Sequence, residues 1–553
     1  MRVIQTDRWN ASSIVDRHEE RSTKTAYIDG DTTLTYGELR QQVNRAGHLL
    51  RGLGVRREDR VLLVLDDSIA FPVMFFGAMR IGAVPVPVSG LDKSENFRHY
   101  HSDTYAEVVV ADAASLPRLQ DALAGEPVRY VFAGEPGHTP PGVLNLAEGL
   151  AGQSDELEAW PTHRDDMAFW LYSSGSTGRP KGAVHLHHDI AVTCETYAAN
   201  VLGLREDDVT FSTTKLFHAY GLGNGLSFPL WFGATAVLMN GPTKPEAILR
   251  TLHRHRPTIF FSVPAVYRMI AREPEAPAAF ASVRRCVSAS EPLPPQTFRT
   301  FKDRFGVEIV DGIGSTELLH IYCSNRPGEI VPGTTGKGVP GYELRLVDEF
   351  GSVLQGAATG ALEVRGDSCA AYYWHQHEKT KSSMRGDWFA TGDRYERRED
   401  GNFVYIGRLD QMFKVGGLWV SPVDMEHALL EHDRVRGVGV TATTINNASR
   451  IAAFVECDGD GDEELAAELR ALCKERLRRY EYPHVVEFVD ALPRTLTGKV
   501  QRFKLRERAA LLGAQPPYDG AREPAPAGGP LKPDECCGHD EARRSTDGPR
   551  AAC

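Results

Sequence analysis

Apolar residues in the first half of the chain form short runs that alternate with amphipathic stretches. Runs with the length and bulk of buried strands occur at residues 61–65, 84–88 and 108–111. The stretch after Thr35 carries apolar residues on one helical face, with Glu38 in capping-box spacing and Gly54 where the helix can end. A second helix is predicted at residues 71–81. Strands that alternate with helices predict an α/β fold of layered, largely parallel sheets.

The pattern is different nearer the C-terminal end. Ser421, Pro422 and Asp424 stand in the N-cap, N1 and N3 positions of a helix. Apolar strands are predicted at residues 435–441, 451–455 and 485–489, with a helix between the last two. A segment of this size can bury a core of its own, so it predicts a smaller α+β unit.

The last segment of the sequence has few apolar residues. Of residues 514–553, 12 of the 40 are Pro or Gly, and Tyr518 and Leu531 are almost the only large apolar side chains. Such a composition cannot bury a core, so this tail is predicted to be disordered.

One stretch combines glycines, hydroxyl groups and cations directly after an apolar run at residues 167–171. It reads Tyr172-Ser-Ser-Gly-Ser-Thr-Gly-Arg-Pro-Lys-Gly182. Glycines let several backbone N–H groups face one point, and Arg179 and Lys181 add charge, which together suit a polyphosphate. The spacing of a Walker A loop is not present, and a solvated Gly/Ser turn is an equally good interpretation of the stretch alone.

This stretch resembles the signature loop of the adenylate-forming superfamily, which includes acyl-CoA synthetases and free-standing adenylation domains. In that family the loop binds the β- and γ-phosphates of ATP. Further motifs of the family follow in the family's order over about residues 10–510. The resemblance implies an ATP site formed by Ser173, Ser174, Gly175, Ser176, Thr177, Gly178, Lys181, Ser290, Glu291, Pro292, Asp311, Gly312, Asp393 and Arg408.

A carboxylate for a magnesium ion is present in the motif Asp311-Gly-Ile-Gly-Ser-Thr-Glu317. At a nucleotide site Mg²⁺ takes one or two carboxylates together with phosphate oxygens and water. Glu317 could instead lie at the start of a helix and complement its dipole. The family resemblance favours its role as a magnesium ligand. It further implies that Thr316 contacts the α-phosphate and that Lys499, in Pro493-Arg-Thr-Leu-Thr-Gly-Lys499, is the catalytic cation that meets the carboxylate and the α-phosphate.

The stretch Thr214-Lys-Leu-Phe-His-Ala-Tyr-Gly-Leu-Gly-Asn-Gly225 is rich in aromatic residues and glycine, which suits the wall of a pocket for a flat ligand. A plain buried turn is the alternative. Together with Leu318-Leu-His-Ile321 it resembles benzoate-CoA ligases in particular, although these often carry Phe where this chain has His218. The implied aryl-acid pocket consists of Phe217, His218, Ala219, Tyr220, Gly221, Phe228, Ile313, Gly314 and His320.

Three histidines, His185, His187 and His188, follow the phosphate loop. In an extended strand His185 and His187 would share a face. We do not expect a metal site here and predict that the three are ordinary polar residues.

Composition excludes several classes of function. The formal net charge of −11 argues against nonspecific nucleic-acid binding. The nine cysteines include no Cys-x-x-Cys pair, so neither a zinc site nor a disulfide framework is indicated. The sequence shows neither a secretory signal nor a stretch that would span a membrane, so a cytoplasmic protein is expected.

The resemblance implies an ATP-dependent aryl-CoA ligase, most like benzoate-CoA ligases, that uses ATP, Mg²⁺ and coenzyme A. Domains are predicted at residues 1–409 and 410–513, with the smaller domain rotating about a hinge at Asp410. A channel for coenzyme A is expected along Lys414, Gly416, Gly417 and Leu418. Two alternatives remain: an adenylating enzyme that loads an aryl acid onto the thiol of an acyl carrier protein, and a non-catalytic nucleotide-binding relative.

Removal of residues 514–553 is expected to leave the melting temperature and the ligase activity nearly unchanged, because the segment lacks apolar side chains that could dock. Calorimetry and activity assays on the truncated and full-length chains check this. A clear drop in melting temperature would mean that the tail is packed.

Overall fold

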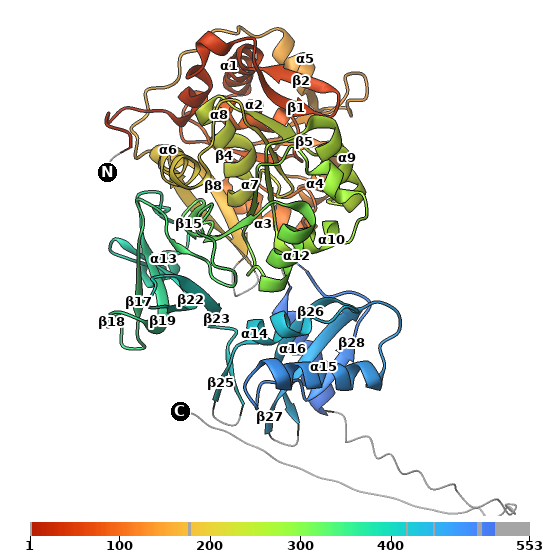
Figure 1. Ribbon diagram of the computed structural model, residues 1–553. Coiled ribbons are helices and arrows are strands. Elements are labelled where there is room, and N and C mark those ends of the chain that lie inside the picture. The colour runs from red at the N-terminus through yellow and green to blue at the C-terminus, as the bar shows by residue number, and fades with distance from the viewer. Residues whose placement is uncertain (1–2, 175–178, 416–417, 446–447, 495–499, 515–553) are drawn as a thin grey trace, which may run out of the picture.

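The architecture is given by a computed structural model that describes residues 3–174, 179–415, 418–445, 448–494 and 500–514. A large N-terminal unit and a smaller C-terminal unit lie one above the other (Figure 1). Each unit contains buried apolar clusters of its own. Within the described ranges, no helix combines the length and the apolar character that crossing a bilayer requires.

A parallel sheet of five strands, in the order β4-β3-β5-β6-β7, forms one part of the large unit. Its strands are β3 (Arg60–Val64), β4 (Val84–Pro87), β5 (Val108–Asp112), β6 (Arg129–Ala133) and β7 (Leu144–Asn145). The helices between and after them are α2 (Ala70–Arg80), α3 (Ser94–Thr104), α4 (Leu116–Ala122) and α5 (Leu146–Ala151). The alternation of strands and helices predicted for this region is confirmed.

A nine-stranded sheet has the order β16-β15-β14-β13-β12-β10-β11-β1-β2. Its strands are β1 (Thr25–Asp29), β2 (Thr32–Thr35), β10 (Val209–Ser212), β11 (Thr235–Leu238), β12 (Ile259–Ser262), β13 (Arg285–Ser288), β14 (Ile309–Gly314), β15 (Ile321–Ser324) and β16 (Lys337–Gly338). Neighbours from β1 to β14 are parallel, whereas the pairs β1–β2, β14–β15 and β15–β16 are antiparallel. Since the carboxyl ends of parallel strands meet at one edge, the loops after β10, β13 and β14 lie close together.

Helices cover the nine-stranded sheet and pack against the part of the large unit that contains the five-stranded sheet. They include α1 (Tyr36–Gly52), α9 (Pro245–His255), α10 (Pro264–Ile270), α11 (Ala276–Ala279) and α12 (Pro295–Phe305). The predicted capping box starts α1, because Thr35 Oγ1 accepts from the Glu38 N–H at 3.2 Å and the Thr35 N–H donates to Glu38 Oε2 at 2.8 Å. The side chains on the inner face of α1 are buried in the main core.

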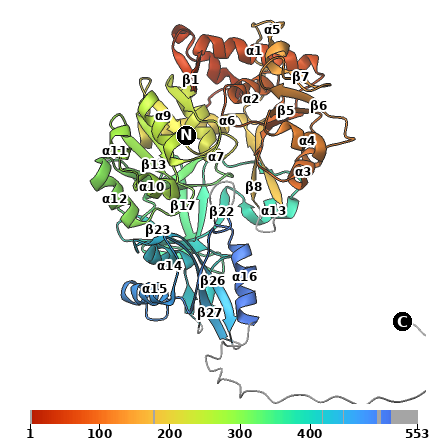
Figure 2. The same ribbon diagram turned by 90° about the vertical axis from the view of Figure 1, so that its right-hand side faces the viewer.

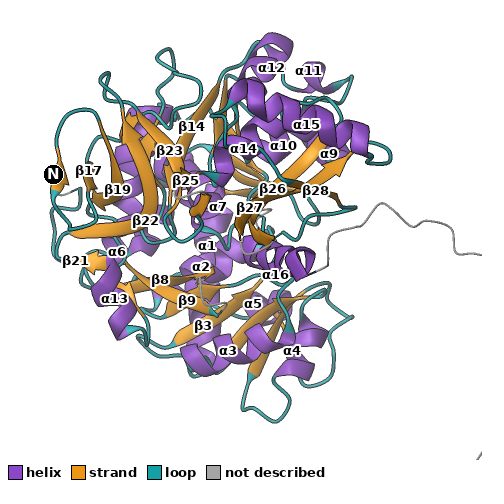
Figure 3. Cartoon of the chain, turned by 90° about the horizontal axis from the view of Figure 1, so that it is seen from below, coloured by secondary structure: helices purple, strands orange, loops and turns teal. Residues whose placement is uncertain are grey.

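The hairpin of β8 (Met167–Ser174) and β9 (Pro180–Leu186) carries the ends of the predicted phosphate loop. A short strand, β20 (Tyr372–Tyr373), pairs with β9. Trp170 and Val184 of the hairpin share a core with Phe97 of α3 and Leu119 of α4, and Figure 3 shows the hairpin running beside β3 above these helices. The predicted buried strand is thus confirmed, and it extends to Ser174.

The three histidines are not residues of one strand. His185 lies in β9, whereas His187 and His188 begin α6 (His187–Thr193). The chain turns there because Asp189 Oδ2 accepts from the Leu186 N–H at 3.1 Å. His185 and His187 are 0% and 1% exposed. Two of the three histidines, His185 and His187, are therefore buried polar residues.

An antiparallel sheet, in the order β18-β17-β19-β22-β21 with β23 paired to β22, completes the large unit. It consists of β17 (Glu343–Val347), β18 (Val353–Leu354), β19 (Ala358–Arg365), β21 (Met384–Arg385), β22 (Trp388–Arg397) and β23 (Phe403–Arg408), with α13 (His377–Ser383) beside it. The β22–β23 register sets Asp393 opposite Arg408. Two predicted nucleotide contacts are thereby neighbours.

The small unit is a three-stranded sheet with helices on it (Figure 2). Its elements are β24 (Phe413–Val415), β25 (Leu418–Val420), α14 (Pro422–Leu429), β26 (Val435–Ile445), β27 (Ala448–Cys457), α15 (Glu463–Arg476), β28 (Val485–Phe488) and α16 (Arg502–Ala514). Ser421 caps α14 as predicted, since its Oγ accepts from the Asp424 N–H at 3.4 Å. The predicted strands and helix of this unit are confirmed.

Candidate active site

A buried ion pair between Lys181 and Glu317 forms the centre of the candidate site. Nζ of Lys181, near the start of β9, lies 3.0 Å from Oε1 of Glu317, in the turn after β14. Tyr373 of β20 joins them, because its hydroxyl donates to the same Oε1 at 2.6 Å and accepts from Lys181 at 2.7 Å. Segments far apart in the chain therefore meet at one carboxylate oxygen.

Burial and charge act in opposite directions on this pair. Burial raises the pKa of Glu317, but Lys181 and the Tyr373 hydroxyl outweigh it and hold that pKa below its usual value. Burial lowers the pKa of Lys181, and the attraction of Glu317 offsets only part of this. Glu317 is therefore an ionised carboxylate, and its site accepts a positive charge.

The β8 end of the hairpin also points at this pair. Ser173 lies opposite Lys181 in the β8–β9 register, and its Oγ is 3.5 Å from Glu317 Oε1. Ser174 is the last residue of β8, and Arg179 is exposed. Several predicted site residues lie outside the described residues, namely Gly175, Ser176, Thr177, Gly178, Gly416, Gly417 and Lys499.

Arg408 contacts both the carboxylate predicted to bind ribose and the residue predicted to be the hinge. Its Nη1 lies 3.1 Å from Asp393 Oδ1 and donates to the Thr391 carbonyl at 2.7 Å. Its Nε lies 3.5 Å from Asp410 Oδ1. The structure thus brings Asp393, Arg408 and Asp410 together at the edge of the large unit.

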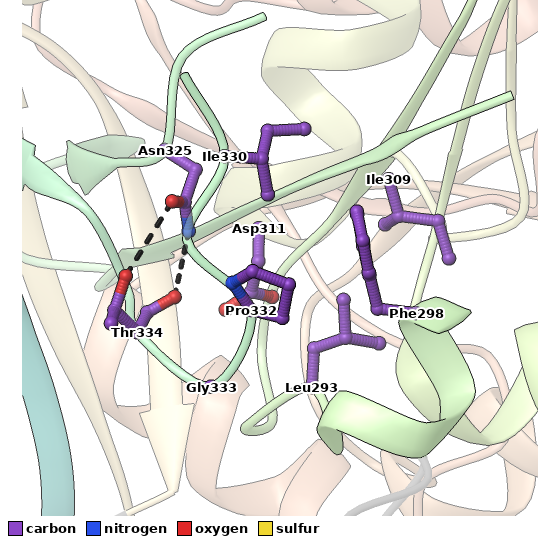
Figure 4. A pocket seen from close by; sticks show the side chains of 9 residues that line it. All are labelled: Leu293, Phe298, Ile309, Asp311, Asn325, Ile330, Pro332, Gly333 and Thr334. Carbon is purple, nitrogen blue, oxygen red and sulfur yellow. Dashed lines mark hydrogen bonds between the residues drawn. The ribbon is translucent and has the colours of Figure 1, made fainter. Parts of the chain in front are cut away.

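The loop after β13 contains Ser290, Glu291 and Pro292. Ser290 has a φ of 76°, which is uncommon for a residue other than glycine. Beside this loop, Asp311 of β14 is buried, and burial raises its pKa well above the usual range. Asp311 lines a cavity of about 10 Å³, large enough for about one water molecule (Figure 4). Gly312 follows Asp311 in the strand.

His320 lies inside a buried aromatic cluster. Its ring centre is 4.5 Å from that of Phe228, 5.1 Å from that of Tyr197 and 5.5 Å from that of Tyr220. Its Nε2 is 3.1 Å from Asn224 Oδ1. Burial lowers the pKa of His320 to about 3, so the ring is neutral at physiological pH.

The other residues of the predicted aryl pocket come from two segments of the chain. They are Phe217, His218, Ala219, Tyr220 and Gly221, around the start of α7 (Ala219–Leu222), and Ile313 and Gly314, at the end of β14. A side chain at Gly221 would place its Cβ 2.1 Å from the Lys215 carbonyl oxygen, and one at Gly314 would come within 2.4 Å of the His320 carbonyl oxygen. Both glycines are needed because the two backbones approach so closely.

Lys414 and Leu418, predicted for a coenzyme A channel, lie in the β24–β25 hairpin of the small unit. The Lys414 carbonyl accepts from Ser449 Oγ at 2.8 Å, so the hairpin packs on β27, and Leu418 is 50% exposed. Figure 1 shows β25 at the far end of the small unit from β8. The structure does not bring these residues to Glu317.

Two residues in contact with the predicted site loops were missed. Tyr373 lies 56 positions after Glu317, and the only sequence signal for it is an aromatic run at residues 372–374. Asp67, in the loop after β3, accepts from the Leu216 N–H at 2.8 Å and so holds the loop that leads to Phe217. Burial raises the pKa of Asp67 to about 7, although Lys215 lowers it.

No group of three or more His, Cys, Asp or Glu side chains in the part of the chain that the structure describes could hold a metal ion. A cation at Glu317 would therefore need further ligands from a bound molecule or from water.

Comparison with protein families gives two matches. The model of the AMP-binding enzyme family matches residues 15–374, and that of the AMP-binding enzyme C-terminal domain matches residues 424–499.

Among characterised proteins, the chain is 44% identical to a benzoate–CoA ligase of Thauera aromatica, with 90% of this chain and 96% of the relative covered. It is 40% identical to a 4-hydroxybenzoate–CoA/benzoate–CoA ligase of Rhodopseudomonas palustris, with 93% and 96% covered.

Solved structures agree with these relatives. A benzoate CoA ligase from Burkholderia xenovorans has a TM-score of 0.85 at 41% identity, with 90% of this chain and 100% of that chain covered. An anthranilate CoA ligase in complex with anthranoyl-AMP has a TM-score of 0.88 at 37% identity, with 92% and 99% covered.

Asp67→Asn keeps an acceptor for the Leu216 N–H and removes the charge. The folded-state pKa of Asp67, about 7, exceeds the value of about 4 expected in the unfolded chain, so its contribution to stability is complete below pH ~4 and is lost as pH rises to about 7. The free energy of unfolding is measured for both proteins by denaturant titration from pH 4.5 to 7.5. As pH rises, the wild type should lose stability relative to Asp67→Asn.

The exposed Asp303→Asn on α12 is the control and should follow the wild type at every pH. Parallel curves for Asp67→Asn and the wild type would contradict the burial of an uncharged Asp67.

Proposed function

The chain belongs to the AMP-binding enzyme family, and on that premise we propose that it is an ATP-dependent ligase that joins an aryl carboxylic acid to coenzyme A. The observation that carries the proposal is the turn at residues 316–320. At one end it holds the Glu317 carboxylate beside Lys181, and at the other it holds the His320 ring in an aromatic cluster. We propose that an aryl acid binds against that cluster with its carboxylate toward Lys181 and Glu317.

The first half-reaction activates the acid. A carboxylate oxygen attacks the α-phosphorus of ATP, the bond to pyrophosphate breaks, and an acyl-AMP anhydride forms. No protein nucleophile is required, so the protein contributes positioning and charge stabilisation. We assign charge stabilisation to Lys181 and Lys499, and contact with the α-phosphate to Thr316.

Glu317 is the residue that would hold Mg²⁺. Its carboxylate is ionised and already pairs with a cation, so the site tolerates positive charge. Phosphate oxygens would attract Lys181, and phosphate and water would supply the other ligands of the metal ion. Mg²⁺ would there neutralise negative charge on the polyphosphate.

The second half-reaction transfers the acyl group. The thiol of coenzyme A loses its proton and attacks the acyl carbonyl carbon, the bond from that carbon to the phosphate oxygen breaks, and AMP leaves. We propose that residues 410–513 rotate about Asp410 between the two steps, exchanging Lys499 for the hairpin at residues 413–420. The contact of Arg408 with both Asp393 and Asp410 supports a link between nucleotide and hinge.

Coenzyme A is favoured over a carrier protein as the acceptor. The relatives at 40–44% identity are named as CoA ligases and align over at least 90% of the chain. We further propose that the acid is of benzoate size, because the cluster around His320 is compact and aromatic.

The substrate class is tested with AMP release in the presence of coenzyme A. We expect the highest kcat/KM for benzoate or a substituted benzoate, a lower value for cinnamate and the lowest for hexadecanoate, since a pocket filled by one ring has no room for a long chain. Reactions without coenzyme A are the control. The highest kcat/KM on hexadecanoate would rule out an aryl pocket.

Lys499→Ala separates the two half-reactions. Acyl-AMP formation should fall by ~10²–10⁴, because a charge-assisted contact that strengthens as charge develops is lost. Conversion of supplied benzoyl-AMP and coenzyme A into benzoyl-CoA should stay near the wild-type rate, because the proposed rotation would by then have exchanged Lys499 for the hairpin at residues 413–420. Lys504→Ala, an exposed lysine on α16, is the matched control. Equal losses in both half-reactions would remove the case for rotation.

A further inference from the structure

The turn at residues 316–320 is held in an unfavourable backbone conformation. Leu319 has a φ of 65° although it is not a glycine, and its side chain is only 3% exposed. Such a conformation persists only where the surrounding structure determines it. The contacts that hold this turn therefore decide where Glu317 and His320 lie.

Each of the three carbonyl groups at the start of the turn accepts a hydrogen bond from outside it. The Thr316 carbonyl lies 2.8 Å from His185 Nε2. The Glu317 carbonyl accepts from the Ala370 N–H at 2.7 Å, and the Leu318 carbonyl accepts from Ser368 Oγ at 2.8 Å. His185 is thus one of the groups that fix the strained segment.

His185 is itself fixed on every side. Its Nδ1 lies 2.8 Å from Oδ2 of Asp189, and both side chains are 0% exposed. Its ring stacks on Phe169 of β8, with centres 5.1 Å apart and planes 16° apart. Nε2 donates to the Thr316 carbonyl, and Nδ1 shares a proton with the Asp189 carboxyl group. Asp189 and Phe169 therefore hold the ring in the orientation that aims Nε2 at Thr316.

Strand β9 contacts the turn twice. Residues four apart in a strand point to the same face, so Lys181 and His185 are on the same side of β9. Lys181 reaches the Glu317 carboxylate, and His185 reaches the Thr316 carbonyl. The distance between the lysine and the carboxylate is thus set by a strand that is attached to the same turn at a second point.

We propose that His185, oriented by Asp189, is a positioning residue that holds Thr316 and Glu317 in register with Lys181. This role rests on the proposed function, because it matters to catalysis only if these groups bind the phosphates of ATP. It differs from the role of His187, whose Nδ1 accepts from the Ala11 N–H at 3.0 Å and so packs the N-terminal segment. Loss of His185 would let the turn relax and move the carboxylate away from the lysine.

Two substitutions separate positioning from packing. His185→Gln can place its amide N–H near the position of Nε2, whereas His185→Asn reaches only the position of Nδ1. We expect His185→Asn to lower kcat for pyrophosphate release by about 10–100-fold, since a misplacement of about 1 Å has that effect. His185→Gln should stay within about threefold of the wild type. His187→Asn, at an equally buried histidine, is the matched control and should change kcat by less than about threefold.

A second measurement does not depend on turnover. The dissociation constant of Mg²⁺-ATP, measured by calorimetry, should rise at least about threefold in His185→Asn and remain near the wild-type value in the other two variants. Equal effects of Asn and Gln at position 185, or equal effects of His185→Asn and His187→Asn, would overturn the proposal and leave His185 a packing residue. If the wild type releases no pyrophosphate with any aryl acid, the proposed function fails, and the binding measurement decides the role of His185 alone.

Discussion

The buried contact of Lys181 with Glu317 and Tyr373 is the interaction on which the site depends. A carboxylate and an ammonium group lose hydration when they are buried, so they remain there only if each supplies what the other has lost. Oε1 of Glu317 accepts from Lys181 and from the Tyr373 hydroxyl, which replaces part of its lost hydration. A nucleotide with a cation offers each group a new partner of opposite charge, so this pair is suited to bind that ligand.

The fold brings this pair to the aromatic cluster through the geometry of parallel strands. Loops after β10, β13 and β14 leave the sheet at the same edge, so segments more than a hundred residues apart line one region. The turn after β14 is short and strained, and it carries Glu317 and His320 at fixed separation. Because donors from β9 and from residues 368–373 surround this turn, its two functional ends cannot move independently.

The contact of Arg408 with Asp393 and Asp410 joins the large unit to the chain that enters the small unit. Ion pairs that are partly exposed contribute little to stability, but they respond to a change of charge nearby. A ligand on Asp393 would compete for the Arg408 guanidinium and so alter its contact with Asp410. This is a simple physical route by which occupancy of the nucleotide site could influence the orientation of the small unit.

The sequence by itself determined what depends on local pattern. The strand before the phosphate loop, the capping box at Thr35 and the capped helix after Ser421 follow from periodicity and side-chain chemistry over a few residues, and the motifs identified the family. Only the tertiary structure decided the role of Tyr373, Asp67 and His185. Their positions depend on contacts across 56, 149 and 131 residues of chain, and a buried histidine has no local sequence signal that distinguishes it from an exposed one.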